Sequence, residues 1–300
     1  MKLIDLQVGG YIGVDFSSPD LNEPDFIKAC INLIEHGTYA FLPTVITSSE
    51  EVYKRNLTLI AMASENAEIK NHILGIHAEG PFISNKLGAV GAHNPDLTKE
   101  PDIEFLKKMQ VWSNGKIKIL TIAAELPNAE KLCRYATKNN ISVFLGHQDA
   151  KLPDLERLAD AGAKAITHLG NGMPNMVNRH DNILHYSLAC DKLAATIITD
   201  GHHLPAHLIK TIIKAKGIDN IAIISDVSPI AGMPPGKYHV SGNDAILEEN
   251  GYLHNPEKKC MVGSSATIVE CVRYIDSLNI LTKEQLQKAV YHNPLRLINS

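Results

Sequence analysis

Eight times along this sequence, a short run of apolar and β-branched residues is followed by a polar turn and then by a segment with helical periodicity. This alternation is typical of βα units around a parallel sheet, and most of the runs are too apolar to leave one strand face in water. Eight such units can close into a barrel. The sequence therefore predicts an α/β fold, a TIM-like (β/α)8 barrel, with strands at residues 3–8, 39–46, 73–79, 116–123, 141–146, 163–168, 193–199 and 221–225.

Helices are predicted between these strands and after the last one. Apolar spacing and capping residues such as Ser48 and Ser49 indicate helices at residues 49–64, 128–139, 153–161, 205–215, 265–278 and 282–298. The irregular stretch 229–260 is too long for a plain loop and is expected to form a hairpin or a lid. The sequence has no linker and no repeat, so residues 1–300 are expected to form a single catalytic barrel domain.

The composition excludes several classes of partner. The formal net charge is -4 and no block of like charges occurs, so neither nucleic acid nor an anionic membrane is an expected partner. The five cysteines lack CxxC spacing and are expected to be reduced thiols. We find no long apolar run and no cleavage-site pattern, so we expect a cytoplasmic protein whose partner is a small molecule.

Polar side chains stand where most of the predicted strands end. Glu79 ends the third strand, His147 follows the fifth, His168 ends the sixth and Asp226 follows the eighth. In a barrel of this type the active site lies at the C-terminal ends of the strands, so these side chains are expected to converge. A single histidine in such a place is more often a hydrogen-bonded structural residue, but four converging groups favour a metal site.

Three of these residues suit a catalytic metal. Glu79, His147 and His168 would leave one coordination position open for a water molecule, as in catalytic zinc sites. Zinc is the expected ion, and the mixed ligands are also compatible with Fe(II), Co or Mn. Asp226 is the expected general base, with a strand-end cap as its structural alternative.

Ten segments of the sequence match one known family in order. The sequence resembles the N-acetylglucosamine-6-phosphate deacetylases of the amidohydrolase superfamily, and the match covers most of the chain. The segments are IDLQVGGYIGVDF (4–16), GTYAFLPTVITS (37–48), GIHAEGPFI (75–83), GAHNPD (91–96), LGHQDA (145–150), THLGNGMP (167–174), ITDGHH (198–203), SDVSPIAGMPPGKY (225–238), VGSSATI (262–268) and NPLRLI (293–298).

The resemblance implies hydrolysis of the acetamide of N-acetylglucosamine 6-phosphate to glucosamine 6-phosphate and acetate. It assigns one divalent metal to Glu79, His147 and His168, and the acid/base role to Asp226. It also implies that Asn171 and the backbone of Gly172 face the phosphate or the sugar hydroxyls, that Arg179 pairs with the phosphate, and that His203 binds near the scissile amide or the sugar. His93 is a further candidate substrate contact.

The resemblance also implies a homodimer, because the family's arginine reaches into the neighbouring subunit's site. On sequence alone Arg179 is equally a solvated loop residue, since it lies in the polar stretch 175–182.

The sequence departs from the family at three places. Gln7 and Gly9 replace the His-x-His that amidohydrolases usually carry after the first strand, which excludes a second metal; the single-metal branch of the deacetylase family also has a glutamine at the first of these positions. The family's small β-sandwich is built from residues before the first strand and after the last helix, and we expect it to be absent. Gly172, Ala124 and residues 180–182 also differ from the usual pattern, which leaves the sugar epimer and the acyl group open.

Two rival interpretations remain. One is another amidohydrolase reaction on the same barrel, such as hydrolysis of a cyclic amide or deamination of a nucleobase, which would not explain Arg179 beside GNGMP. The other is a catalytically silent sugar-phosphate-binding protein, which has no physical reason to keep four ionisable groups facing one another.

Overall fold

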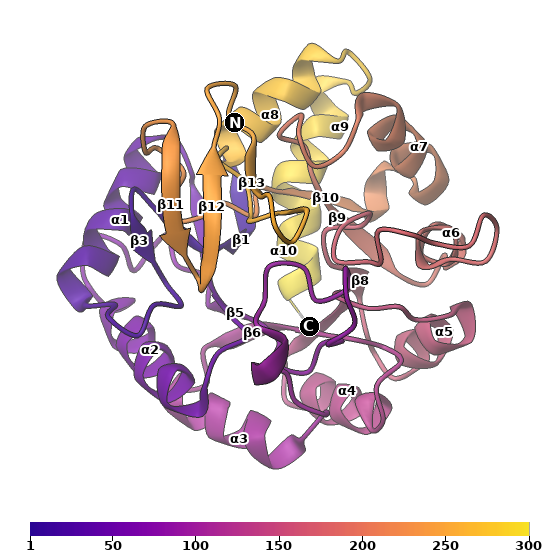
Figure 1. Cartoon of the computed structure of the whole chain (residues 1–300), viewed down its shortest axis with the longest axis horizontal. Helices are drawn as coiled ribbons and strands as arrows, with labels where there is room; N and C mark the ends of the chain where they lie inside the picture. Colours follow the sequence, from indigo (N-terminus) through magenta and orange to yellow (C-terminus); the bar gives the residue numbers. More distant parts are fainter. Residues whose placement is uncertain (300) are drawn as a thin grey trace.

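The computed structural model describes residues 1–299 and shows a ring of eight parallel strands surrounded by helices (Figure 1). The strands pair in chain order, and a parallel bridge between Val8 and Val227 joins the first strand to the segment after the last. They are β1 (Ile4–Val8), β4 (Ala40–Ile46), β5 (Ile76–Glu79), β6 (Ile117–Ile122), β7 (Ser142–Leu145), β8 (Ala165–Ile166), β9 (Ala194–Ile198) and β10 (Ile221–Ile224). The predicted (β/α)8 barrel is confirmed.

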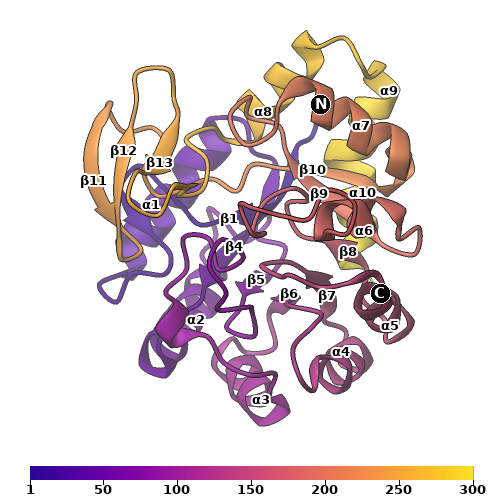
Figure 2. The same ribbon diagram turned by 45° about the vertical axis from the view of Figure 1, so that its right-hand side comes forward.

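Helices cover the outside of the barrel (Figures 1 and 2). They are α1 (Glu23–Glu35), α2 (Glu50–Ala63), α3 (Ile103–Trp112), α4 (Ala129–Lys138), α5 (Leu152–Asp160), α6 (Ile183–Ala189), α7 (Ala206–Lys216), α8 (Ile268–Ser277), α9 (Lys283–Gln287) and α10 (Asn293–Ile298). Every helix that the sequence predicts is present. The π-helical residues Lys288–His292 join α9 to α10. Pro294 has no backbone N–H to donate, which accounts for the wider turn before it.

Alternation along the strands divides the core into two layers. Leu120, Val143 and Ile223 face outward and pack against the helices, whereas Ile119 and Phe144 face the barrel interior. Leu297 and Ile298 of α10 join the interior cluster, and the carbonyl of Leu297 accepts a hydrogen bond from the Ser142 hydroxyl at 2.7 Å. Helix α10 therefore closes the end of the barrel at which the strands begin, and the mouth lies where they end.

The stretch after β10 forms a small antiparallel sheet beside the mouth (Figure 2). Its strands are β11 (Gly236–Val240), β12 (Asn243–Leu247), β13 (Leu253–Asn255) and β14 (Cys260–Met261). A short hairpin of β2 (Gly10–Tyr11) and β3 (Val14–Asp15) lies next to it, and the Ser241 hydroxyl donates to Asp15 at 2.8 Å. Residues 229–260 were expected to form a hairpin or a lid, and the structure shows hairpins there.

Two expectations about the whole protein have different outcomes. No described helix is both long and apolar enough to span a bilayer. The absence of a β-sandwich domain, and with it the single-domain organisation, stays a prediction.

Candidate active site

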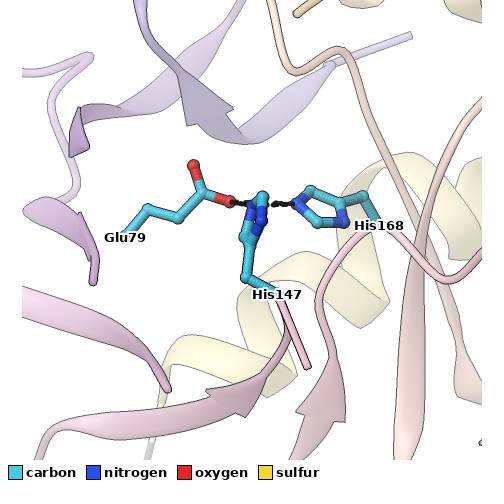
Figure 3. A group of neighbouring side chains, drawn as sticks. All are labelled: Glu79, His147 and His168. Carbon is cyan, nitrogen blue, oxygen red and sulfur yellow. Dashed lines mark hydrogen bonds and ion pairs between the residues drawn. The ribbon is translucent and has the colours of Figure 1, made fainter. Parts of the chain in front are cut away.

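Three predicted metal ligands meet at the centre of the barrel mouth (Figure 3). Glu79 ends β5, and His147 and His168 follow β7 and β8 by two residues. Glu79 Oε1 lies 3.2 Å from His147 Nε2 and 3.0 Å from His168 Nε2, and the two nitrogens are 3.0 Å apart. All three residues are buried, with 3%, 6% and 3% of their surface exposed. The convergence expected from the sequence is present.

Hydrogen bonding around His147 indicates a cation site. His147 Nδ1 lies 2.9 Å from the carbonyl oxygen of Ala89, which can only accept, so Nδ1 carries a proton. In the neutral ring, Nε2 then presents a lone pair to Glu79 Oε1, which is also an acceptor. Two acceptors at 3.2 Å need a proton or a metal ion between them. One carboxylate oxygen and two imidazole nitrogens suit a divalent metal such as zinc.

The charges of the site point the same way. Burial works against the charge on Glu79, but hydrogen bonds from His147 and His168 hold its pKa well below the usual value. Burial likewise opposes protonation of His147, yet the hydrogen bond and charge of Glu79 raise the pKa of this imidazole. Burial and then the charge of Glu79 raise the pKa of Asp226 to about 6. The site therefore favours positive charge next to Glu79.

The backbone turns sharply at three of the four predicted chemical residues. His147, His168 and Asp226 have φ angles of 51°, 31° and 54°, in the left-handed region that residues with a side chain seldom adopt. Such a conformation costs about 1–3 kcal/mol per residue and persists only where the surrounding structure imposes it. Each of the three lies two residues after the end of its strand, so the strained bend aims its side chain into the mouth.

Gly172 explains one departure from the family pattern. Its φ is 58°, and a Cβ atom there would lie 3.0 Å from His147 Nδ1 and from His168 Cε1. Contacts this short are tighter than nearly all real Cβ contacts, so a side chain at this position would make the imidazoles shift slightly. Glycine avoids this shift and suits the positive φ where the 170–172 backbone approaches the predicted metal ligands.

Gln7 connects Glu79, one of the predicted metal ligands, to the predicted base. Its Nε2 donates to Glu79 Oε1 at 2.9 Å and to Asp226 Oδ1 at 2.8 Å. The amide thus stands where the superfamily's second metal would need a ligand, and it supplies two donors in place of a cation. This geometry agrees with a site for one metal.

Two further histidines lie beside the ligands. His93 is buried, its ring centre is 4.3 Å from that of His147, and its Nε2 is 3.8 Å from Glu79 Oε2. His77 uses both ring nitrogens, Nδ1 with the carbonyl of Leu6 at 3.0 Å and Nε2 with the Thr121 hydroxyl at 2.8 Å. His93 therefore belongs to the site, and His77 has a structural role.

A cavity of about 490 Å³ opens above the triad. It contains most of the residues predicted for substrate binding, namely His93, Asn171, Gly172 and His203, and also Asp226. Arg179 is not among the lining residues and lies in an exposed loop. The structure thus brings all predicted site residues except Arg179 to one cavity of this chain.

Several lining residues are missed by the sequence analysis. Asp15 comes from the β2–β3 hairpin, and Tyr252 and Lys259 come from the small sheet. Lys259 is the one Lys or Arg among the lining residues. Asp200, which contacts His203, could have been identified from the sequence, because it begins the DGHH stretch at the end of a strand. Sequence spacing alone could not predict that the small sheet lies at the barrel mouth.

Comparison with known proteins gives relatives of one kind. No family model matches the chain. The chain is 31% identical over 261 residues to the N-acetylglucosamine-6-phosphate deacetylase of Lysinibacillus sphaericus, covering 87% of this chain and 66% of the relative. It is 32% identical over 248 residues to the enzyme of the same name from Bacillus subtilis (strain 168), covering 82% and 62%. The chain thus spans slightly less than two thirds of the length of either relative.

A solved structure supports the fold. The crystal structure of N-acetyl-D-glucosamine-6-phosphate deacetylase from Mycobacterium smegmatis superposes with a TM-score of 0.88 at 24% identity, over 99% of this chain and 77% of that one. The barrel and the small sheet are therefore an arrangement seen in an experimental structure.

Proposed function

The chain belongs to the N-acetylglucosamine-6-phosphate deacetylase family, and on this basis we propose that it hydrolyses the acetamide of N-acetylglucosamine 6-phosphate or a close N-acetyl-hexosamine 6-phosphate. The products are the amino-sugar phosphate and acetate. One observation carries the proposal: the donor atoms of Glu79, His147 and His168 converge at the cavity beside Asp226.

Glu79, His147 and His168 hold one divalent metal in this proposal, and zinc suits their donor set best. An ion bound there would polarise the amide carbonyl and lower the pKa of the attacking water. The hydrogen bond from His147 Nδ1 to Ala89 keeps Nε2 free as a ligand and fixes the ring orientation.

Asp226 accepts a proton from the attacking water and passes it to the departing amine. Gln7 holds Asp226 Oδ1, which leaves Oδ2 for the proton transfer. Burial raises the pKa of Asp226, which makes its carboxylate a better proton acceptor than an exposed aspartate.

Substrate recognition uses the remaining cavity residues. The ring of His93 and the segment of Asn171 and Gly172 lie beside the metal ligands, near the expected amide and sugar. A phosphate needs positive charge, and Lys259 is the lining residue of this chain that supplies it permanently.

A second copy of the chain would bring Arg179 to the phosphate, and we propose a homodimer for this reason. The loop of Arg179 carries Met176, which is 91% exposed, and Leu87 nearby is 88% exposed. These two loops touch, since a Cβ on Gly88 would lie 2.8 Å from Pro174 Cα. Exposed apolar side chains grouped beside a cavity favour an interface.

The cytoplasm is the proposed location. The five cysteines form no disulfide among the described residues, and four of them are buried, as expected in a reducing compartment.

The test is acetate release from N-acetylglucosamine 6-phosphate by zinc-loaded protein. N-acetylgalactosamine 6-phosphate and a dihydropyrimidine are assayed separately as alternative substrates. We expect turnover of the N-acetyl sugar phosphates. Turnover of the dihydropyrimidine alone would favour a cyclic-amide hydrolase, and metal binding without any turnover would favour the silent binding protein.

A further inference from the structure

Asp200 lies behind His203 and is one of the most heavily hydrogen-bonded carboxylates of the barrel mouth. Its side chain is 1% exposed. Oδ1 accepts from the backbone amides of His202 and His203, both at 2.9 Å. Oδ2 accepts from His203 Nδ1 at 2.7 Å and from the Ser264 hydroxyl at 2.7 Å.

Four donors around one carboxyl group keep it ionised. Burial opposes the charge on Asp200, but the hydrogen bond and charge of His203, together with the backbone amides, hold its pKa far below the usual value. A carboxylate cannot donate, so His203 Nδ1 must carry the proton of their shared hydrogen bond. The side chain of His203 lines the cavity, and Nε2 is its remaining ring nitrogen.

The Asp200–His203 pair is also held in a fixed position relative to Asp226. The backbone amide of Ser264 donates to the carbonyl of Asp226 at 2.8 Å, so the same residue contacts Asp200 and the strand end that bears the base. Gly201 has a φ of 83°, and a Cβ there would lie 2.8 Å from the ring of Tyr274. The turn is therefore closely packed, and the ring of His203 has a defined direction.

We propose that Asp200 is a positioning residue: it orients His203 and stabilises a second proton on Nε2, which donates to a negatively charged oxygen of the substrate. The same arrangement of carboxylate and imidazole supports a transient imidazolium in other hydrolases. This inference rests on the proposed function. The oxygen belongs either to the phosphate or to the amide carbonyl as it becomes an oxyanion, and the choice of substrate separates the two.

A purely structural role is the competing explanation, since Asp200 caps the turn through two backbone amides. Asp200→Asn separates the roles, because an asparagine oxygen still accepts from both amides but carries no charge. An asparagine can also donate to His203 Nδ1, which would place the single proton of a neutral ring on Nε2, so the variant keeps an uncharged donor at Nε2 and loses the charge of the imidazolium.

The experiment is a double-mutant cycle of Asp200→Asn and His203→Asn on the zinc-loaded protein. We expect each single change to lower kcat/KM about 100-fold. Because Asp200 acts through His203, adding Asp200→Asn to His203→Asn should cost less than about threefold more. Full additivity of the two losses, or less than a fivefold loss in Asp200→Asn, would overturn the proposal.

Two substrates identify the oxygen. A loss in Asp200→Asn with N-acetylglucosamine 6-phosphate that disappears with unphosphorylated N-acetylglucosamine assigns the contact to the phosphate. An equal loss with both substrates assigns it to the oxyanion. Asp244→Asn is the matched control, because Asp244 contacts His239 Nδ1 at 2.8 Å in an exposed pair away from the cavity, and it should leave kcat/KM unchanged.

A spectroscopic measurement keeps the inference separate from the proposed activity. In ¹⁵N-histidine spectra, the signals that vanish in His203→Asn should show a protonated Nδ1 in the wild type, and this proton should move to Nε2 in Asp200→Asn. An unchanged tautomer would contradict the inference even if the enzyme turns over. The expected shift in a protein without turnover would contradict only the proposed function.

Discussion

The floor and the rim of the cavity are built in different ways. The floor, formed by Glu79, His147, His168 and Asp226, lies at strand ends, and its three proposed metal ligands are at most 6% exposed. The rim, formed by the loop 173–182 and the turn 256–259, is largely exposed, with Met176 at 91%. Buried hydrogen bonds and strained backbone hold the floor in place, whereas the rim consists of loops.

This difference separates the reaction from the choice of substrate. Groups that transfer protons or hold a metal need positions fixed within fractions of an ångström, which packed strands provide. Groups that recognise the distant end of a substrate tolerate variation and commonly lie on loops. Floor substitutions should therefore lower turnover for every substrate, and rim substitutions should change substrate affinity. Four predictions test this division.

Removal of the metal, or His147→Asn, should abolish turnover of all substrates. Without the ion, two acceptor groups face each other at 3.2 Å. Zinc at about 1,000 times its dissociation constant should stabilise the wild type by about 4 kcal/mol, and much less the variant. Calorimetry and thermal unfolding with and without zinc measure this. His239→Gln, at an exposed histidine, is the control, and equal zinc stabilisation of wild type and His147→Asn would refute the ligand assignment.

Asp226→Asn should lower kcat by about 10²–10⁴-fold, because the amide cannot accept the proton of the attacking water. Gln7 can still hydrogen bond the amide oxygen, so folding and zinc binding should be retained. Steady-state acetate release and zinc titration check both statements. A variant that keeps more than a tenth of the wild-type kcat would show that another group is the base.

Asp5 supports the floor from the outer side of β1, and its charge should make the barrel less stable as pH rises. It accepts hydrogen bonds from the amide and hydroxyl of Ser225 and from the amide of Gln7. Burial raises its pKa from 3.8 to about 6 in spite of these bonds. The raised pKa means that the stabilising contribution is complete below pH 3.8 and is lost as pH rises through 6.

Asp5→Asn removes this titration. Relative to wild type, the free energy of unfolding of the variant should therefore increase by about 2 kcal/mol between pH 4 and pH 7. Urea unfolding of both proteins at several pH values gives the difference, in which the other titrating groups cancel. A difference independent of pH would mean that Asp5 does not change its charge in this range.

Lys259→Ala should raise KM for N-acetylglucosamine 6-phosphate about tenfold and leave kcat nearly unchanged, because a charged hydrogen bond to the phosphate is lost. Lys258→Ala is the matched control, since Lys258 is adjacent but does not line the cavity. An unphosphorylated substrate should show no difference. Equal effects of the two lysines would mean that the phosphate interacts with the overall positive charge of the turn and not with Lys259 in particular.

The barrel and its chemical floor were largely predictable from local pattern. A strand is recognised by its apolar run, and the residue that ends a strand in a βα barrel faces the mouth, so Glu79, His147, His168 and Asp226 could be placed together without coordinates. Asp200 ends a strand as well, but its importance lies in hydrogen bonds to His203 and Ser264, and Ser264 is 64 positions away.

By itself, the sequence determined the repeated βα units, the approximate positions of six helical segments and the convergence of four polar strand ends. Each of these depends on neighbours in the chain and on the closure of eight similar units into one barrel. Only the tertiary structure decided that Lys259 and Tyr252 line the cavity and that Arg179 does not. It also decided that a side chain at Gly172 would crowd His147 and His168, and that Gln7 joins Asp226 to Glu79. These contacts depend on how distant segments approach one another, which no local periodicity encodes.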